Sequence, residues 1–192
     1  MVSFSHEFLV DLFRTRGELA PALLRHAELA FEHDRVEHGS IDLSQVVSTE
    51  YRADCVVVLR DRANAAVAGG IVEVQLRPDR DKERTWPVYV AVLHAKLDCP
   101  AVLLVLTPDP GVARWARGPF RTGHPGFSLV PVVIGFDDLP RITDPAQATS
   151  VPELAVLSAL ANPELEVADA AITAISDLPE DRFRLYLDVI LA

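Results

Sequence analysis

Three short apolar runs constrain the fold of this chain more than any other feature. They are CVVVL at 55–59, IVEV at 71–74 and AVLLVL at 101–106. Such runs, bounded by turn residues, are typical of strands, and the run at 55–59 has the pattern of a strand that is buried on both faces. A helical stripe that includes Trp86, Tyr89 and Leu93 predicts a helix over 80–97.

The rest of the chain predicts an α/β fold with a mixed central β-sheet that is flanked by helices. Further strands are expected at 45–49 and, as one strand, at 127–136, while the turn at 61–70 makes 54–59 and 71–76 a hairpin. Helices are expected within 6–30, at 110–118, and at 151–161, 164–177 and 180–191. We therefore predict a core at 1–140 and a C-terminal helical extension at 150–192.

The composition and charge of the chain are those of a globular protein and limit how it could bind nucleic acid. The chain has 192 residues, 49% of them hydrophobic and 24% charged, which are globular values. A formal charge of −10 argues against nucleic-acid binding through the net field, although it allows a local basic groove. The chain shows no secretory signal and no apolar stretch of ~20 residues, so we expect a cytoplasmic protein without a membrane partner. Cys55 and Cys99 form no CxxC pattern and are expected to be buried.

Glu73 is the residue in the apolar runs that most needs an explanation. Strand alternation places Glu73 and Gln75 on the same side as Ile71. If that side is buried, the carboxylate must be paired, hydrogen-bonded or bound to a metal, and on an edge strand it would simply be solvated. Asp54 opens the neighbouring strand, and strands lie ~4.8 Å apart. Asp54 and Glu73 could thus chelate Mg²⁺ or Mn²⁺, or they could be a strand-start Asp and an edge-strand Glu.

The order of these elements resembles the core of the PD-(D/E)XK nuclease superfamily, the restriction-endonuclease-like core. That core is a helix, a strand, a strand with Asp, a strand with Glu-x-Lys, a helix and a strand, and here Glu73-x-Gln75 replaces Glu-x-Lys. More closely, the chain resembles recombination-promoting, YhgA-like transposase-associated nucleases and their actinobacterial relatives over residues 6–120. The segments that carry this resemblance are HEFLVDLF, EYRADCVVVL, IVEVQLRPDRDK, WPVYVAVL and CPAVLLVLTPD.

The resemblance implies roles for particular residues. Asp54 and Glu73 would be metal ligands, with the Val74 carbonyl as a third, and Gln75 would take the lysine position and orient a water or donate to a phosphate oxygen. Lys82 could swing back over the metal, as migrated lysines do in this superfamily, or it could be solvated and paired with Asp79 or Asp81. Two acidic residues could add to the metal site, although a first-turn helical Glu is the alternative for the first of them: Glu7 and Glu50.

Basic residues concentrate after the Glu73 strand, in the short helix at 110–118 and just after that helix. They would contact phosphates or would be ordinary surface arginines: Arg77, Arg80, Arg84, Arg114, Arg117 and Arg121. Trp86 and Trp115 could stack on bases, but helical spacing favours the core. The spacing of His26, His33 and His38 matches no zinc site and favours an exposed loop.

These observations lead to one main functional expectation and two alternatives. The main one is a Mg²⁺- or Mn²⁺-dependent DNA endonuclease. The first alternative is a catalytically inactive module of the same fold that binds nucleic acid or protein. The second is a structural dimer through the C-terminal helices, since ELAVLSALA and LYLDVILA carry much apolar surface.

Overall fold

The computed structural model of this protein describes residues 19–29, 31–37 and 53–191. The chain divides into two compact units, Met1–Thr49 and Glu50–Ala192. In the first unit, α2 (Leu19–His26) accounts for one of the helices predicted within 6–30. The predicted strand at 45–49 and the two acidic candidates Glu7 and Glu50 lie outside the described residues.

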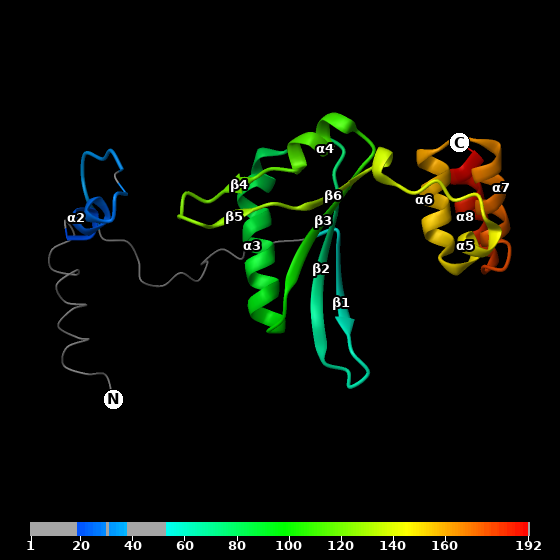
Figure 1. The fold of residues 1–192 in the computed structure, drawn as a ribbon, viewed down its shortest axis with the longest axis horizontal. Coiled ribbons are helices and arrows are strands. Elements are labelled where there is room, and N and C mark those ends of the chain that lie inside the picture. The colour runs from blue at the N-terminus through cyan, green and yellow to red at the C-terminus, as the bar shows by residue number, and fades with distance from the viewer. Residues whose placement is uncertain (1–18, 30, 38–52, 192) are drawn as a thin grey trace. The chain divides into compact units, whose positions relative to one another are not determined.

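The second unit has the predicted α/β fold, built on a mixed four-stranded sheet (Figure 1). The strands are β1 (Cys55–Arg60), β2 (Ala66–Val74), β3 (Ala101–Thr107) and β6 (Val132–Gly135), in the order β1-β2-β3-β6. β1 pairs antiparallel with β2, as the predicted hairpin requires, whereas β2, β3 and β6 run parallel. The carboxyl ends of the three parallel strands therefore lie at the same edge of the sheet.

The hairpin turn is shorter than the sequence predicted, because β2 begins at Ala66. Asp61 closes the turn by accepting a hydrogen bond from the Ala65 N–H at 2.9 Å. The small residues that follow suit a strand that lies close under a helix: a Cβ on Gly69 would stand 2.8 Å from the side chains of Leu93 and Leu97. Glycines that indicated a turn here instead allow close helix–sheet packing.

Two helices cover the sheet side that carries Ile71 and Leu103. They are α3 (Arg80–Leu97), as predicted, and α4 (Pro110–Ala116). Each begins at an aspartate that accepts hydrogen bonds from backbone N–H groups of the first turn: Asp79 for α3 and Asp109 for α4. Trp86 is fully buried, as predicted, and its ring lies 5.4 Å from those of both Trp115 and Phe120. This aromatic cluster fixes the first half of α3 against the sheet.

Several sequence predictions need correction. Residues 127–136 form two strands, because Pro131 has no N–H and interrupts the ladder. The first of them, β5 (Ser128–Leu129), pairs with β4 (Phe120–Arg121) in a separate two-stranded sheet. β1 is an edge strand of the described sheet, with Val57 43% and Leu59 58% exposed, so it is not buried on both faces. Cys55 is exposed for the same reason, whereas Cys99 is buried as predicted.

The C-terminal part is helical, as predicted. After η1 (Phe136–Asp138) come α5 (Pro145–Ser150), α6 (Pro152–Ala161), α7 (Leu165–Ile175) and α8 (Glu180–Leu191). Their small side chains pack into a core of their own, which includes Ala155, Val167 and Ala171. Leu165, Leu185 and Leu191 remain 77%, 59% and 69% exposed. Dimerisation through these helices and the domain boundaries near 140–150 stay predictions.

None of the described helices is both long and apolar enough to cross a membrane.

Candidate metal and phosphate site

Glu73 is buried at the carboxyl end of β2, on the side of the sheet that α3 covers. Its side chain is 0% exposed, and its Oε2 accepts a hydrogen bond from Lys82 Nζ at 2.5 Å. Lys82 lies in the first turn of α3, directly above that end of β2. The alternative of a solvated edge-strand glutamate is therefore wrong, and the carboxylate is paired as a buried charge must be.

Lys82 does not form an ion pair with Asp79 or Asp81, the two partners that the sequence suggested. Asp79 caps α3 through the Asp81 N–H at 2.9 Å, and Asp81 pairs with Arg84 at 2.6 Å. Both nearby carboxylates are thus engaged. The ammonium group of Lys82 instead turns to the sheet and lies 5.7 Å from the centre of the Tyr89 ring.

Electrostatics favour the charged form of this lysine. Burial alone would lower the pKa of Lys82, but the hydrogen bond and charge of Glu73 outweigh burial, with smaller contributions from Tyr89 and Asp54. The pKa of Lys82 is therefore held above its ordinary value. The ammonium group is a permanent cation at physiological pH.

Asp54 stands at the same end of the hairpin as Glu73. Cys55 pairs with Val72 and Val56 with Ile71, so the next pair in that register brings Asp54 opposite Glu73. Asp54 Oδ2 accepts a hydrogen bond from the Val74 N–H at 2.8 Å, which holds this exposed carboxylate beside the end of β2. The hairpin register thus brings two carboxylates and one ammonium group together.

The donor atoms at this end of β2 fit a divalent cation. Glu73 Oε1 is buried and, unlike Oε2, has no hydrogen-bond partner. A buried carboxylate oxygen without a partner is costly, and a cation would relieve that cost. Within the described ranges no three His, Cys, Asp or Glu residues come together, so side chains there would supply two carboxylates at most, and the Val74 carbonyl stays a predicted third ligand. An all-oxygen set suits Mg²⁺ or Mn²⁺.

Gln75 lies two positions after Glu73 and is 8% exposed. Its Nε2 donates a hydrogen bond to the Arg77 carbonyl at 2.6 Å, and its N–H bonds to the Leu106 carbonyl at 2.9 Å. One N–H of this amide therefore shapes the β2–α3 loop, and its role toward a water or a phosphate oxygen stays a prediction. The cation next to Glu73 comes from Lys82.

The arginines fall into two groups. Two of them are engaged by acidic residues: Arg84 with Asp81, and Arg117 with Asp138 at 2.7 Å. The side chains of the others are exposed and make no hydrogen bond or ion pair within the described ranges: Arg77, Arg80, Arg114 and Arg121. Arg77 and Arg80 follow β2, and Arg114 lies on α4, which follows β3. These three arginines therefore lie at the carboxyl ends of the parallel strands, where Glu73 also lies.

The charge of the chain is unevenly distributed. Residues 53–136 carry ten Arg and Lys against eight Asp and Glu, a net +2. Residues 137–192 carry three against eleven, a net −8. Most of the formal −10 therefore belongs to the C-terminal helical part, and the part that contains the candidate site is slightly basic. The net charge is a weak argument against phosphate binding at this site.

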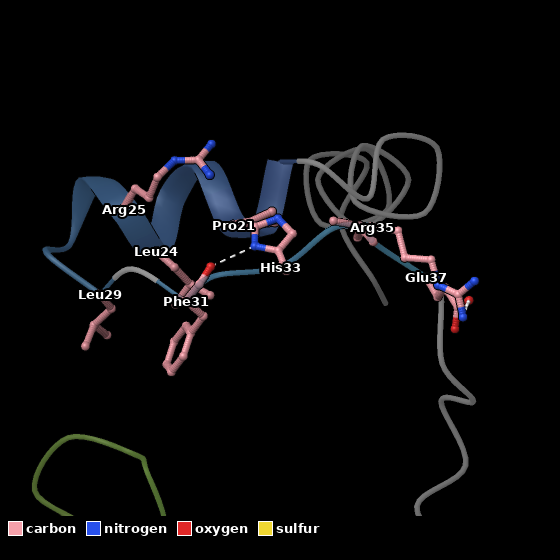
Figure 2. Close-up of a pocket in the computed structure, with 9 residues that line it drawn as sticks. Pro21, Leu24, Arg25, Leu29, Phe31, His33, Arg35 and Glu37 are labelled. Carbon is pink, nitrogen blue, oxygen red and sulfur yellow. Dashed lines mark hydrogen bonds and ion pairs between the residues drawn. The ribbon is translucent and has the colours of Figure 1, made fainter.

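In the described part of the histidine-rich segment, no three His, Cys, Asp or Glu residues come together. His33 is exposed, and its Nδ1–H donates to the Phe31 carbonyl at 2.8 Å (Figure 2). Arg35 and Glu37 pair at 2.8 Å, and with His33 they line a pocket of about 280 Å³. The exposed-loop prediction is confirmed for His33 and is wrong for His26, which is the last residue of α2, while His38 lies outside the described residues.

The Lys82–Glu73 pair should make the free energy of unfolding depend on alkaline pH. Because the folded-state pKa of Lys82 is raised, its contribution is fully present below the unfolded-state pKa of ~10.4 and is lost as the pH rises through the folded-state pKa. Urea unfolding of the wild type above pH ~10.4 should show this loss relative to a Lys82→Met/Glu73→Gln variant. A Lys96→Met control should keep the wild-type loss, and parallel curves for all three proteins would contradict the assignment.

Sequence reasoning missed that Lys82 bonds directly to Glu73. The signal was available in the position of Lys82 in the first turn of the helix that follows the Glu73 strand, but the competing aspartates obscured it. No family model, no curated protein and no solved structure matches this chain.

Proposed function

We propose that this protein is a Mg²⁺- or Mn²⁺-dependent DNA endonuclease that hydrolyses phosphodiester bonds at the Asp54–Glu73–Lys82 site. The observation that carries the proposal is the buried Glu73 carboxylate. One of its oxygens accepts a hydrogen bond from Lys82, and the other has no hydrogen-bond partner. A purely structural ion pair would not require Asp54 beside it. Two acids and a lysine at one strand end are the groups that metal-assisted phosphodiester hydrolysis needs.

Each residue has a distinct task in this proposal. Asp54, Glu73 and the Val74 carbonyl would hold the ion, which would activate water and stabilise the charge that develops on the scissile phosphate. Lys82 donates to a non-bridging oxygen of that phosphate, where a fixed cation has its largest effect on the transition state. Arg77, Arg80 and Arg114 contact flanking phosphates without reading sequence, as does Arg121 in a minor role.

The metal site is tested by thermal stability and cleavage together. Mn²⁺ should raise the melting temperature of the wild type but not that of Glu73→Gln, because only a folded site with both carboxylates binds the ion. The same wild-type protein should nick supercoiled plasmid in Mn²⁺ and in Mg²⁺, and Glu73→Gln should not. Asp169→Asn, which removes an exposed carboxylate of α7, serves as the matched control. Equal melting shifts in wild type and Glu73→Gln would overturn the metal site.

One observation favours a second candidate, a non-cleaving DNA-binding module of the same fold. Lys82 already neutralises Glu73, so the ion pair can satisfy the buried charge without a metal. In that case DNA would bind with no Mn²⁺-dependent melting shift and no nicking. The cytoplasmic location and the homodimer stay predictions under either function.

A further inference from the structure

A groove between β1 and α3 leads away from the candidate site. It has a volume of about 300 Å³, and its walls include Val56 on β1 and Tyr89, Val92 and Lys96 on α3. The Tyr89 ring that lines the groove is the ring over which the Lys82 ammonium group lies, at 5.7 Å. The groove therefore starts where the proposed reaction takes place.

The groove is apolar in its walls and cationic at its ends. Lys82, Tyr89 and Lys96 are spaced by seven residues, so they follow one stripe of α3 over ~21 Å. Lys96 is exposed and, within the described residues, its side chain makes no hydrogen bond or ion pair. Val56 and Val92 are 50% and 55% exposed, so apolar surface remains open between the two lysines. This arrangement is complementary to a ligand with flat apolar groups and a repeating negative charge.

We propose that this groove binds a single-stranded polynucleotide, with a base stacked on Tyr89 and backbone phosphates on Lys82 and Lys96. The inference rests on the proposed function, because it defines the substrate class of the same site. Grooves that bind single strands combine cations along the backbone with aromatic rings for the bases. A duplex keeps its bases stacked inside, so it cannot offer a base face to Tyr89. The groove thus selects single-stranded or locally opened substrate.

Direct binding in EDTA tests the stacking part of the proposal without any cleavage. The probe is a fluorescein-labelled oligothymidylate of about ten nucleotides, within the ~4–16 nucleotides that such grooves cover. Fluorescence anisotropy should show that Tyr89→Leu weakens binding by about 5- to 150-fold, since stacking contributes ~1–3 kcal/mol per base. Tyr89→Phe, which keeps the ring, should bind like the wild type. Circular dichroism confirms that both variants fold.

The charge part is tested by the salt dependence of the same binding. Lys96→Ala should reduce the slope of log K against log salt concentration by ~0.7, the value for one single-strand phosphate contact. Arg182→Ala, an exposed arginine on α8, should leave the slope unchanged. An oligouridylate probe asks whether RNA is bound as well as DNA, and equal affinity would still support the groove.

Two results would overturn the groove assignment. One is oligothymidylate binding that is unchanged in both Tyr89→Leu and Lys96→Ala. The other is tighter binding of a blunt duplex than of the single strand by the wild type. Neither result depends on cleavage: single-strand binding without Mn²⁺-dependent nicking would refute the endonuclease and keep the groove, whereas duplex nicking that ignores Tyr89→Leu would do the reverse.

Discussion

Lys82→Met is expected to abolish plasmid nicking and to lower the free energy of unfolding by about 3–5 kcal/mol at neutral pH. The loss of activity follows because the variant removes the only cation that touches Glu73 in the described part of the chain. The loss of stability follows because Glu73 is 0% exposed and would keep a buried charge without a partner. Urea unfolding and the nicking assay measure the two effects on the same protein.

The double variant Lys82→Met/Glu73→Gln separates stability from catalysis. Removing both charges leaves no buried ion, so most of the lost stability should return, while nicking should stay absent. A Lys82→Met protein that is as stable as the wild type would show that Glu73 is solvated in solution. A Lys82→Met protein that nicks normally would remove Lys82 from the proposed reaction.

The sequence predicted the elements around the site well, because their signals are local. The apolar stripe predicted the helix at 80–97, where α3 lies, and the run AVLLVL predicted β3. The alternation in IVEV assigned Glu73 to the side of Ile71, which is the side that α3 covers. Periodicity decides these points because each depends on neighbours only a few residues away.

Contacts between elements could not be predicted from local sequence patterns. The exposed edge position of β1 depends on which strands pair. A short apolar run has the same sequence pattern in a central strand as in an edge strand, so the pattern cannot distinguish them. The choice of Lys82 between Glu73 and the adjacent aspartates depends on the tertiary approach of α3 to β2. On sequence alone, two close carboxylates suggest that Glu73→Ala leaves the fold intact or slightly stabilises it. The ion pair reverses that expectation, because this change also removes the partner of Lys82.

The position of the catalytic lysine can be moved along the chain if the proposed site is correct. Gln75 directly follows β2, is buried like Glu73, and stands at the position that a Glu-x-Lys motif would fill, where strand alternation predicts it on the side of Glu73. Gln75→Lys in the Lys82→Met background should therefore restore nicking by about tenfold or more, since a single positioned donor is worth ~10²–10³ in rate.

The matched control for this rescue is Leu76→Lys in the same background. Leu76 is the next residue, 70% exposed, so a lysine there adds the same charge without approaching Glu73. Rescue by Gln75→Lys alone would show that the reaction needs a cation held at the Glu73 carboxylate, whichever element supplies it. Equal rescue by both lysines would show that the added charge acts only by attracting DNA. Such a rescue would also weaken as the salt concentration rises. A third outcome is that neither lysine rescues nicking although the Gln75→Lys protein is folded and still binds Mn²⁺. That result would mean that the reaction needs a lysine at position 82 of α3. The Glu73-x-Gln75 segment would then serve only to hold the ion.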